Sequence, residues 1–161
     1  MTVVLFRVDE RLIHGQVVIG WKRETRPDRY VIVDDELAGS EWEQELYLLA
    51  LPEHVSADFL DVDGALERIE AMERSDERIV LLTRDLDTML HLAADGGLEG
   101  RHVNLGGIHH AEGRTRIRPY LHLDDADRAR IRELRDAGVT VSARDLPGSQ
   151  RVGVDSLLRT G

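Results

Sequence analysis

Short apolar runs alternate along the chain with stretches in which apolar residues recur every three or four positions. The run from 3 to 8 is apolar except for Arg7, which is typical of a strand buried on both faces of a sheet. Similar runs predict further strands at 30–33, 78–83, 102–105 and 139–143, and a weaker alternating pattern predicts a short strand at 55–60. The longer spacing predicts helices at 14–24, 39–51, 64–74, 86–94 and 124–137. Strands and helices therefore follow one another in strict order.

This order predicts an α/β fold with a single open, mainly parallel, twisted sheet and helices on both faces. The segment 112–123 departs from it, because turn residues and alternation there, with Pro119, predict an antiparallel edge strand or a bulge. In the helix at 39–51 we expect one face to point into the core, made of Trp42, Leu46, Leu49 and Ala50. No repeat or linker interrupts the chain, which predicts a single domain over residues 1–161.

The composition excludes several classes of protein. Hydrophobic residues make up 42% and charged residues 32%, which argues against disorder. The absence of cysteine excludes disulfides, thiolate metal sites and cysteine nucleophiles. Asp and Glu number 31 against 21 Lys and Arg, and a net charge of -10 disfavours nucleic acid as a partner. The chain has neither a signal peptide pattern nor a run of about 20 apolar residues, so we expect a cytoplasmic protein.

The candidate site lies directly after the first strand, because ligands of parallel sheets bind beyond the carboxyl ends of the strands. This loop carries Arg7, Asp9, Glu10, Arg11 and His14, and the following helix is expected to begin at or just after the histidine. A helix N-terminus beside an arginine favours phosphate, and a histidine there can act as nucleophile, base or metal ligand. The alternative is a turn of solvated charges that caps the helix, and spacing alone favours neither.

Two adjacent histidines, His109 and His110, follow the glycine pair 106–107 at another strand end. Adjacent side chains rarely point the same way, and no third ligand is set by spacing, so we predict no metal site. We expect these histidines on a docking surface or at the rim of a phosphate pocket. The chain lacks the glycine-rich motifs of dinucleotide and P-loop sites and the serine elbow of hydrolases. Its only lysine, Lys22, lies in the first helix, whereas a response-regulator receiver needs one after a late strand.

The residues from 7 to 17, RVDERLIHGQV, resemble a known phosphorylation-site motif. It is the motif of enzyme IIB in the mannose/fructose/sorbose family of the bacterial phosphoenolpyruvate-dependent sugar phosphotransferase system. The likeness continues at 31–38 (VIVDDELA), 103–108 (VNLGGI) and 112–115 (EGRT), and it spans nearly the whole chain. Because the motif starts at the first strand, we expect a free subunit and not a fusion to enzyme IIA.

The resemblance implies that His14 accepts a phosphoryl group from a phosphohistidine on enzyme IIA and passes it to a sugar bound by the membrane enzymes IIC and IID. The implied activity is that of a protein-Nπ-phosphohistidine–sugar phosphotransferase without a cofactor, in a cytoplasmic protein peripherally associated with its membrane transporter. Arg11 matches the arginine expected to contact the phosphoryl oxygens. The other residues expected to shape the loop or the phosphate pocket are Arg7, Asp9, Gly15, Gln16, Asp34, Asn104, Gly106 and Gly107.

Two departures from the family pattern lie beside this site. His109-His110-Ala111 stand where a bulky residue followed by a basic one is expected, and Arg114 stands where lysine is common. Both changes bear on the partner surface and on the class of sugar. Two other functions stay open: a regulatory phosphoprotein without sugar transport, and a metal-dependent hydrolase that uses His14, His109 and Asp34. Neither the sugar nor the oligomeric state follows from the sequence.

Overall fold

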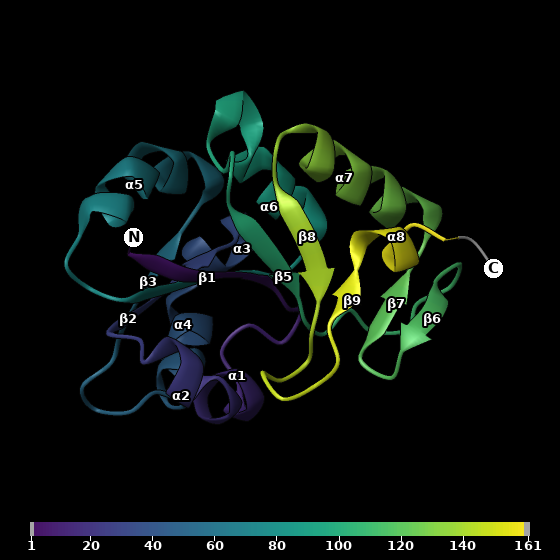
Figure 1. Cartoon of the computed structure of the whole chain (residues 1–161). Coiled ribbons are helices and arrows are strands. Elements are labelled where there is room, and N and C mark those ends of the chain that lie inside the picture. Colours follow the sequence, from purple (N-terminus) through teal and green to yellow (C-terminus); the bar gives the residue numbers. More distant parts are fainter. Residues whose placement is uncertain (1, 160–161) are drawn as a thin grey trace.

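A seven-stranded sheet forms the centre of the molecule in the computed structural model, which describes residues 2–159. The strand order is β3-β2-β4-β1-β5-β8-β9 (Figure 1). The strands are β1 (Val3–Val8), β2 (Arg29–Val33), β3 (Ser56–Leu60), β4 (Ile79–Thr83), β5 (His102–Leu105), β8 (Thr140–Ala143) and β9 (Val152–Gly153). All neighbours are parallel except β9, which pairs antiparallel to β8. This arrangement confirms the predicted fold class.

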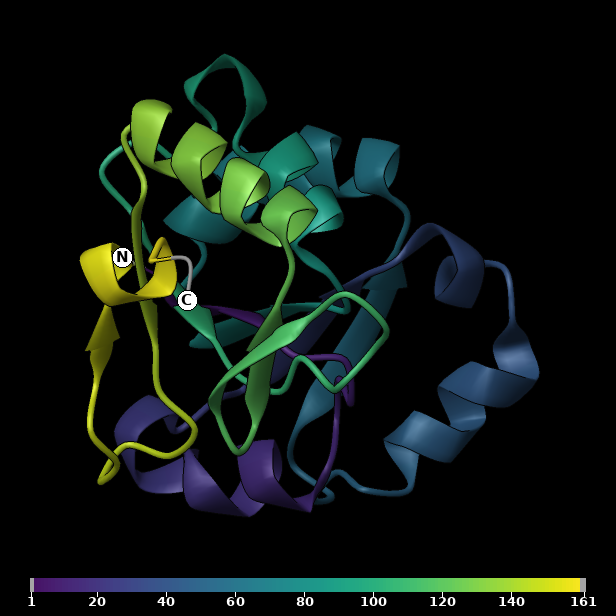
Figure 2. The same cartoon turned by 90° about the vertical axis from the view of Figure 1, so that its right-hand side faces the viewer.

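Helices cover both faces of the sheet, as the alternation predicted (Figures 1 and 2). One face carries α1 (Gly15–Gly20), α2 (Lys22–Thr25), α3 (Asp35–Ala38) and α4 (Glu41–Leu48). The other face carries α5 (Val62–Arg74), α6 (Leu86–Leu92), α7 (Asp125–Asp136) and α8 (Val154–Leu157), and a short 3-10 turn follows α6 at Ala94–Gly96. Each face has its own apolar core, so the sheet is buried on both sides. No helix within residues 2–159 is long and apolar enough to cross a membrane.

Aspartates begin four of these eight α-helices. The carboxylates of Asp34, Asp61, Asp85 and Asp124 each accept a hydrogen bond from a backbone N–H in the first turn of the helix that follows. Such caps satisfy donors that have no partner inside the helix, and their negative charge suits the helix N-terminus. Part of the acidic composition is therefore used to start helices directly after strands.

The segment at 112–123 pairs antiparallel, as predicted, but forms a sheet of its own. Its strands are β6 (Thr115–Arg118) and β7 (Leu121–Leu123), with Pro119 in the turn between them. The buried side chains of Leu121 and Leu123 join the core beneath α7, so the hairpin packs on the molecule without extending the main sheet. The antiparallel edge strand of that sheet is β9.

The prediction for the helix at 39–51 is wrong in its buried face. The side chains of Trp42, Leu46 and Leu49 are 67%, 58% and 82% exposed, and Ala50 is exposed as well. The opposite side of α4 holds the helix, because Gln44 donates to the carbonyl oxygens of the α3 segment and Tyr47 packs against Phe59. The helix expected at 14–24 is interrupted at Trp21, whose buried indole donates to a backbone oxygen beyond β8.

Candidate phosphorylation site

The loop from Asp9 to His14 leaves the central strand β1 and is fastened to its neighbours. The N–H of Asp9 donates to Thr83 at the end of β4, and the N–H of Glu10 donates to Gly107 beyond β5. Leu12 is fully buried and adopts a left-handed conformation with φ of 54°, which is uncommon for a residue other than glycine. A strained residue persists only where its surroundings over-determine it, so the loop holds a defined shape.

Asp9 is the centre of this loop and is inaccessible to solvent. Its Oδ2 accepts from Nη2 of Arg7 at 3.0 Å and from Nη2 of Arg11 at 2.9 Å, and it lies 3.3 Å from Nε2 of His14. Its Oδ1 accepts from the backbone N and from Nε of Arg11, both at 3.0 Å. Burial alone would raise the pKa of Asp9, but the hydrogen bonds from His14 and Arg11 and the charge of Arg7 outweigh it and lower the pKa. Asp9 is therefore ionised at neutral pH.

Arg7 is the second buried charge and ties three strands together. Its guanidinium donates to Oδ1 of Asn104 on β5 and to the backbone oxygens of Arg144 and Asp145 beyond β8, at 2.9 and 3.2 Å. It also lies 5.2 Å from the centre of the Trp21 ring. Burial lowers the pKa of Arg7, and Asp9 opposes this effect. Arginine keeps its proton in proteins, so Arg7 and Asp9 form a buried ion pair and not a solvated turn.

Glycine is required at 106 and 107 because the backbone there passes directly over this pair. A Cβ at Gly106 would overlap the guanidinium of Arg7 and the carboxylate of Asp9. A Cβ at Gly107 would lie 2.9 Å from Nε of Arg11. The two glycines therefore allow the loop beyond β5 to close over the charges beneath it.

His14 lies at the start of α1, with 17% of its side chain exposed. Its Nδ1 accepts a hydrogen bond from the backbone N–H of Gln16 at 3.2 Å, while Nε2 faces the carboxylate of Asp9. An ionised carboxylate accepts only, so the neutral ring carries its proton on Nε2. The lone pair is then on Nδ1, at the helix N-terminus.

Arg11 and Gln16 continue the site toward solvent. Nη1 of Arg11 donates to Oε1 of Gln16, and Nε2 of Gln16 donates to Asp145 Oδ2 at 3.2 Å. Arg11 remains 30% exposed, and the attraction of Asp9 and Asp145 outweighs its desolvation and raises its pKa. Together with Tyr120 and neighbouring residues, Arg11 and Gln16 line an open hollow of about 490 Å³. The hollow is wide enough to admit a group from another molecule.

Most of the predicted residues meet in this site, and two lie outside its contacts. The cluster contains Arg7, Asp9, Arg11, His14, Gln16, Asn104, Gly106 and Gly107. Gly15 begins α1 and is exposed, and a Cβ there would meet nothing within 4 Å. Asp34 caps α3 and pairs with Arg84 at 3.4 Å, so its contacts belong to a different loop. Asp145 was missed, although it follows a predicted strand by the same rule that found the others.

The histidines near the site have separate partners. Nδ1 of His109 lies 2.9 Å from Oε2 of Glu10, and the ring of His110 lies edge-on to His122 with centres 5.6 Å apart. Arg114 bridges Glu10 and Asp127 at 3.1 and 3.3 Å. Across residues 2–159, no three His, Asp or Glu side chains are grouped as a metal site would require.

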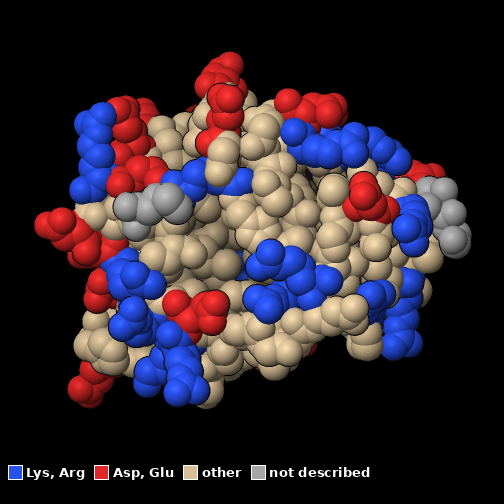
Figure 3. Space-filling model, viewed as in Figure 1, with Lys and Arg blue, Asp and Glu red and all other residues tan. Residues whose placement is uncertain are grey.

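Charge is unevenly distributed over the surface despite the excess of acidic residues. On the face seen in Figure 3, Lys and Arg side chains gather over β8 and β9 and over α2. Acidic side chains lie mainly along the upper and left margins of this view. The chain beyond β8, which supplies Asp145 to the site, therefore adjoins a basic part of an acidic protein.

The sequence profile of the PTS system sorbose subfamily IIB component matches residues 3–161. The chain belongs to this family. It is 32% identical over 144 residues to the sorbose-specific EIIB component of Lacticaseibacillus casei, covering 89% of this chain and 87% of that protein. It is 28% identical over 158 residues to the mannose-specific EIIAB component of Escherichia coli K12, covering 98% of this IIB chain and 49% of that protein.

A solved structure has the same fold. The IIBSor domain of the sorbose permease from Klebsiella pneumoniae superposes with a TM-score of 0.88 at 25% identity, covering 100% of this IIB chain and 99% of that domain. The resemblance to the mannose/fructose/sorbose family is thus confirmed. As a IIB component, the protein is a part of the phosphotransferase system that phosphorylates sugars.

Proposed function

We propose that this chain is a phosphocarrier in sugar uptake, with His14 as the residue that carries the phosphoryl group. The donor is the phosphohistidine of an enzyme IIA, and the acceptor is a sugar bound by the membrane enzymes IIC and IID. The observation that carries the proposal is the orientation of the His14 ring. Asp9 faces Nε2, Nδ1 keeps its lone pair at the N-terminus of α1, and the partly exposed Arg11 is held at the same carboxylate.

The reaction transfers one phosphoryl group between two imidazole rings. Nδ1 of His14 attacks the phosphorus, a new P–N bond forms, and the P–N bond of the donor breaks and leaves its electron pair on the donor nitrogen. Positive charge develops on the His14 ring during attack, and the ionised carboxylate of Asp9 stabilises it through Nε2–H. Asp9 also prevents the ring from turning, which keeps the nucleophilic nitrogen in line with the phosphorus.

The phosphoryl oxygens need donors in both the accepting and the donating step. The N–H of Gln16 now donates to Nδ1, and once Nδ1 is phosphorylated it can donate to a phosphoryl oxygen instead. Arg11 adds positive charge to the site. Its guanidinium is held by hydrogen bonds to Asp9 and Gln16 and remains partly exposed to solvent. Such electrostatic stabilisation is the main contribution a protein makes to phosphoryl transfer.

The names of the relatives support the partners and the class of substrate. The mannose-specific EIIAB component joins an A and a B part in one protein, as expected if the two exchange phosphate. The E. coli EIIAB component is named for mannose and the L. casei EIIB component for sorbose, so we propose a monosaccharide as the substrate class for this chain. We place the protein on the cytoplasmic side of a membrane transporter.

The test is phosphorylation by a phosphorylated enzyme IIA of the family, followed by mapping of the acid-labile phosphate. We expect one phosphate on His14, attached through Nδ1, and none in His14→Ala. His91→Ala is the matched control, because His91 lies on α6 on the opposite face of the sheet. Phosphate on His109 or His110 in His14→Ala would show that the carrier residue is wrong. Sugar phosphorylation on addition of IIC and IID membranes tests the transport role.

A further inference from the structure

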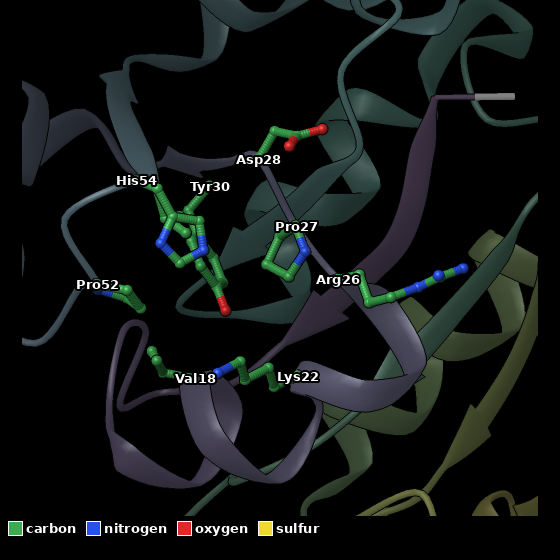
Figure 4. A pocket seen from close by; sticks show the side chains of 9 residues that line it. Val18, Lys22, Arg26, Pro27, Asp28, Tyr30, Pro52 and His54 are labelled. Atoms are coloured by element: carbon green, nitrogen blue, oxygen red, sulfur yellow. The ribbon is translucent and has the colours of Figure 1, made fainter.

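A second concave site lies at the amino ends of β2 and β3, away from the carboxyl-end loop that holds His14. Figure 4 shows it between the α1–α2 segment, the residues that lead into β2 and the segment before β3. Its volume is about 220 Å³, below the roughly 300–1,000 Å³ typical of sites for drug-sized ligands. A ligand that fits it is therefore a small metabolite.

The tyrosine in its wall has an unusual property. Tyr30 is 1% exposed, and its hydroxyl oxygen is buried without a hydrogen-bond partner anywhere in residues 2–159. Buried hydroxyls are nearly always paired, and an unpaired one costs free energy that phenylalanine would avoid. Burial also raises the pKa of Tyr30 to about 12, so the hydroxyl keeps its proton and can donate. The hydroxyl is therefore a donor that no group within residues 2–159 uses.

The other polar groups that point inward complement an anion. In Figure 4 the amino end of Lys22 and the ring of His54 lie near the tyrosine hydroxyl, whereas the side chain of Arg26 extends away from the pocket. Lys22 is the only lysine of the chain and donates but cannot accept. The one acidic lining residue, Asp28, already accepts from the backbone N–H of Arg78 at 2.8 Å. The lining therefore offers Lys22 and the hydroxyl of Tyr30 as donors, and one ring nitrogen of His54 can donate as well.

The remaining walls are apolar. Val18, Pro27 and Pro52 line the site between these polar groups. Rigid proline rings and a buried valine offer a flat, dry surface to the body of a ligand and few hydrogen bonds. Recognition therefore combines an apolar body with a charged end.

We infer that this pocket binds a small organic anion, with its carboxylate or phosphate group at Tyr30 and Lys22 and an apolar body against the prolines. The tyrosine hydroxyl is buried in the structure, so a ligand reaches it only when neighbouring side chains move, and we expect the exposed side chain of Lys22 to be one of them. The inference does not rest on the phosphocarrier function, because it is argued from a pocket whose lining does not include His14.

The test is a titration of the ¹⁵N-labelled full chain, followed by NMR, with benzoate, phenyl phosphate and benzyl alcohol. We expect saturable shifts at the amides of Val18, Lys22 and Tyr30 with at least one of the two anions, and binding of benzyl alcohol at least tenfold weaker. The two anions distinguish a carboxylate from a phosphate as the preferred end. No saturable shift with either anion, or equal binding of the uncharged alcohol, would overturn the inference.

Two substitutions locate the binding. Tyr30→Phe and Lys22→Gln should each weaken the anion about tenfold or more, as loss of a hydrogen bond to a charged group does. Tyr47→Phe and Arg23→Gln are matched controls that lie outside the pocket lining and should bind as wild type does. Tyr30→Phe should melt at the same or a higher temperature, and its phosphorylation at His14 should be unchanged. Undiminished binding in Tyr30→Phe and Lys22→Gln would show that the anion binds elsewhere.

Discussion

Replacing Asp9 by asparagine should destabilise the protein strongly, because it leaves Arg7 buried without its counter-charge. Asp9 and Arg7 are both fully inaccessible, and their side chains are paired at 3.0 Å. Removing one partner of a buried ion pair costs about 3–5 kcal/mol. The amide group of the asparagine would in addition place an N–H donor where Arg7, Arg11 and His14 all donate. For a chain of this length the loss lowers the melting temperature by roughly 6–20 °C.

The assay is urea unfolding followed by circular dichroism, with Asp9→Asn measured beside Asp136→Asn. The carboxylate of Asp136 is 76% exposed and pairs only loosely with Arg135, so its loss should change stability by less than about 0.5 kcal/mol. A loss below about 1 kcal/mol in Asp9→Asn would refute the reasoning, since it would mean that Arg7 needs no buried counter-charge.

Acid provides a second measurement of the same pair. The pKa of Asp9 is lowered from its usual 3.8, so the folded state binds this proton less readily than the unfolded chain. The stability from Asp9 is therefore complete above about pH 4 and is lost as the pH falls toward the folded pKa. The free energy of unfolding should fall less steeply below pH 4 in Asp9→Asn than in the wild type. Parallel acid profiles would contradict this assignment.

Three further predictions test the site and its surroundings. Arg11→Ala should slow phosphorylation of His14 by about 10²–10³-fold, because it removes a donor that stabilises the transferring group, and it should lower stability by only about 1 kcal/mol. A phosphorylation rate equal to that of the wild type would show that Arg11 takes no part in the transfer step. Gly106→Ala should unfold at clearly lower urea concentration than Gly15→Ala, because only the first substitution adds a Cβ against Arg7 and Asp9. Similar unfolding midpoints in urea would contradict the close approach of the Gly106 backbone to these two side chains. Burial lowers the pKa of His102, so the folded chain binds its proton less readily and stability should fall as the pH drops through about 6.5; His102→Asn should flatten this part of the profile, and an unchanged slope would count against it.

The central parallel strands could be predicted because both of their faces are buried, whereas the two-residue strand β9 was not predicted. A strand such as β1 then consists of consecutive apolar residues, and its ends lie where that run stops. The face of α4 could not be predicted in the same way. Trp42, Leu46 and Leu49 follow a helical spacing that shows that they share a face, but not whether that face meets the core. The orientation of α4 is decided by contacts of Gln44 and Tyr47, which lie on the other side of the helix from these three residues.

The candidate site was predictable where its residues are close in sequence or follow neighbouring strands. Arg7, Asp9, Arg11 and His14 lie within one loop, and their contacts with one another follow from that proximity. Asp34 also follows a strand, but the order β2-β4-β1 places a whole strand between its loop and that of His14. Strand order depends on long-range packing that a pattern of apolar residues does not encode. Asp145 differs from Asp34 in this respect, because it follows the predicted strand at 139–143 and could have been found by its position alone.

The contacts of Arg7 also make the charged centre of the site depend on a part of the chain that is synthesised late. The guanidinium of Arg7 donates to the backbone oxygens of Arg144 and Asp145, which lie 137 and 138 positions later in the chain. These two acceptors are synthesised after its other hydrogen-bond partners. Until β8 has been synthesised and has packed on the sheet, Arg7 in the central strand lacks two of its hydrogen-bond acceptors. The guanidinium that pairs with Asp9 is then not fully held in place. A chain truncated before Arg144 therefore lacks two of the acceptors that hold Arg7 against Asp9.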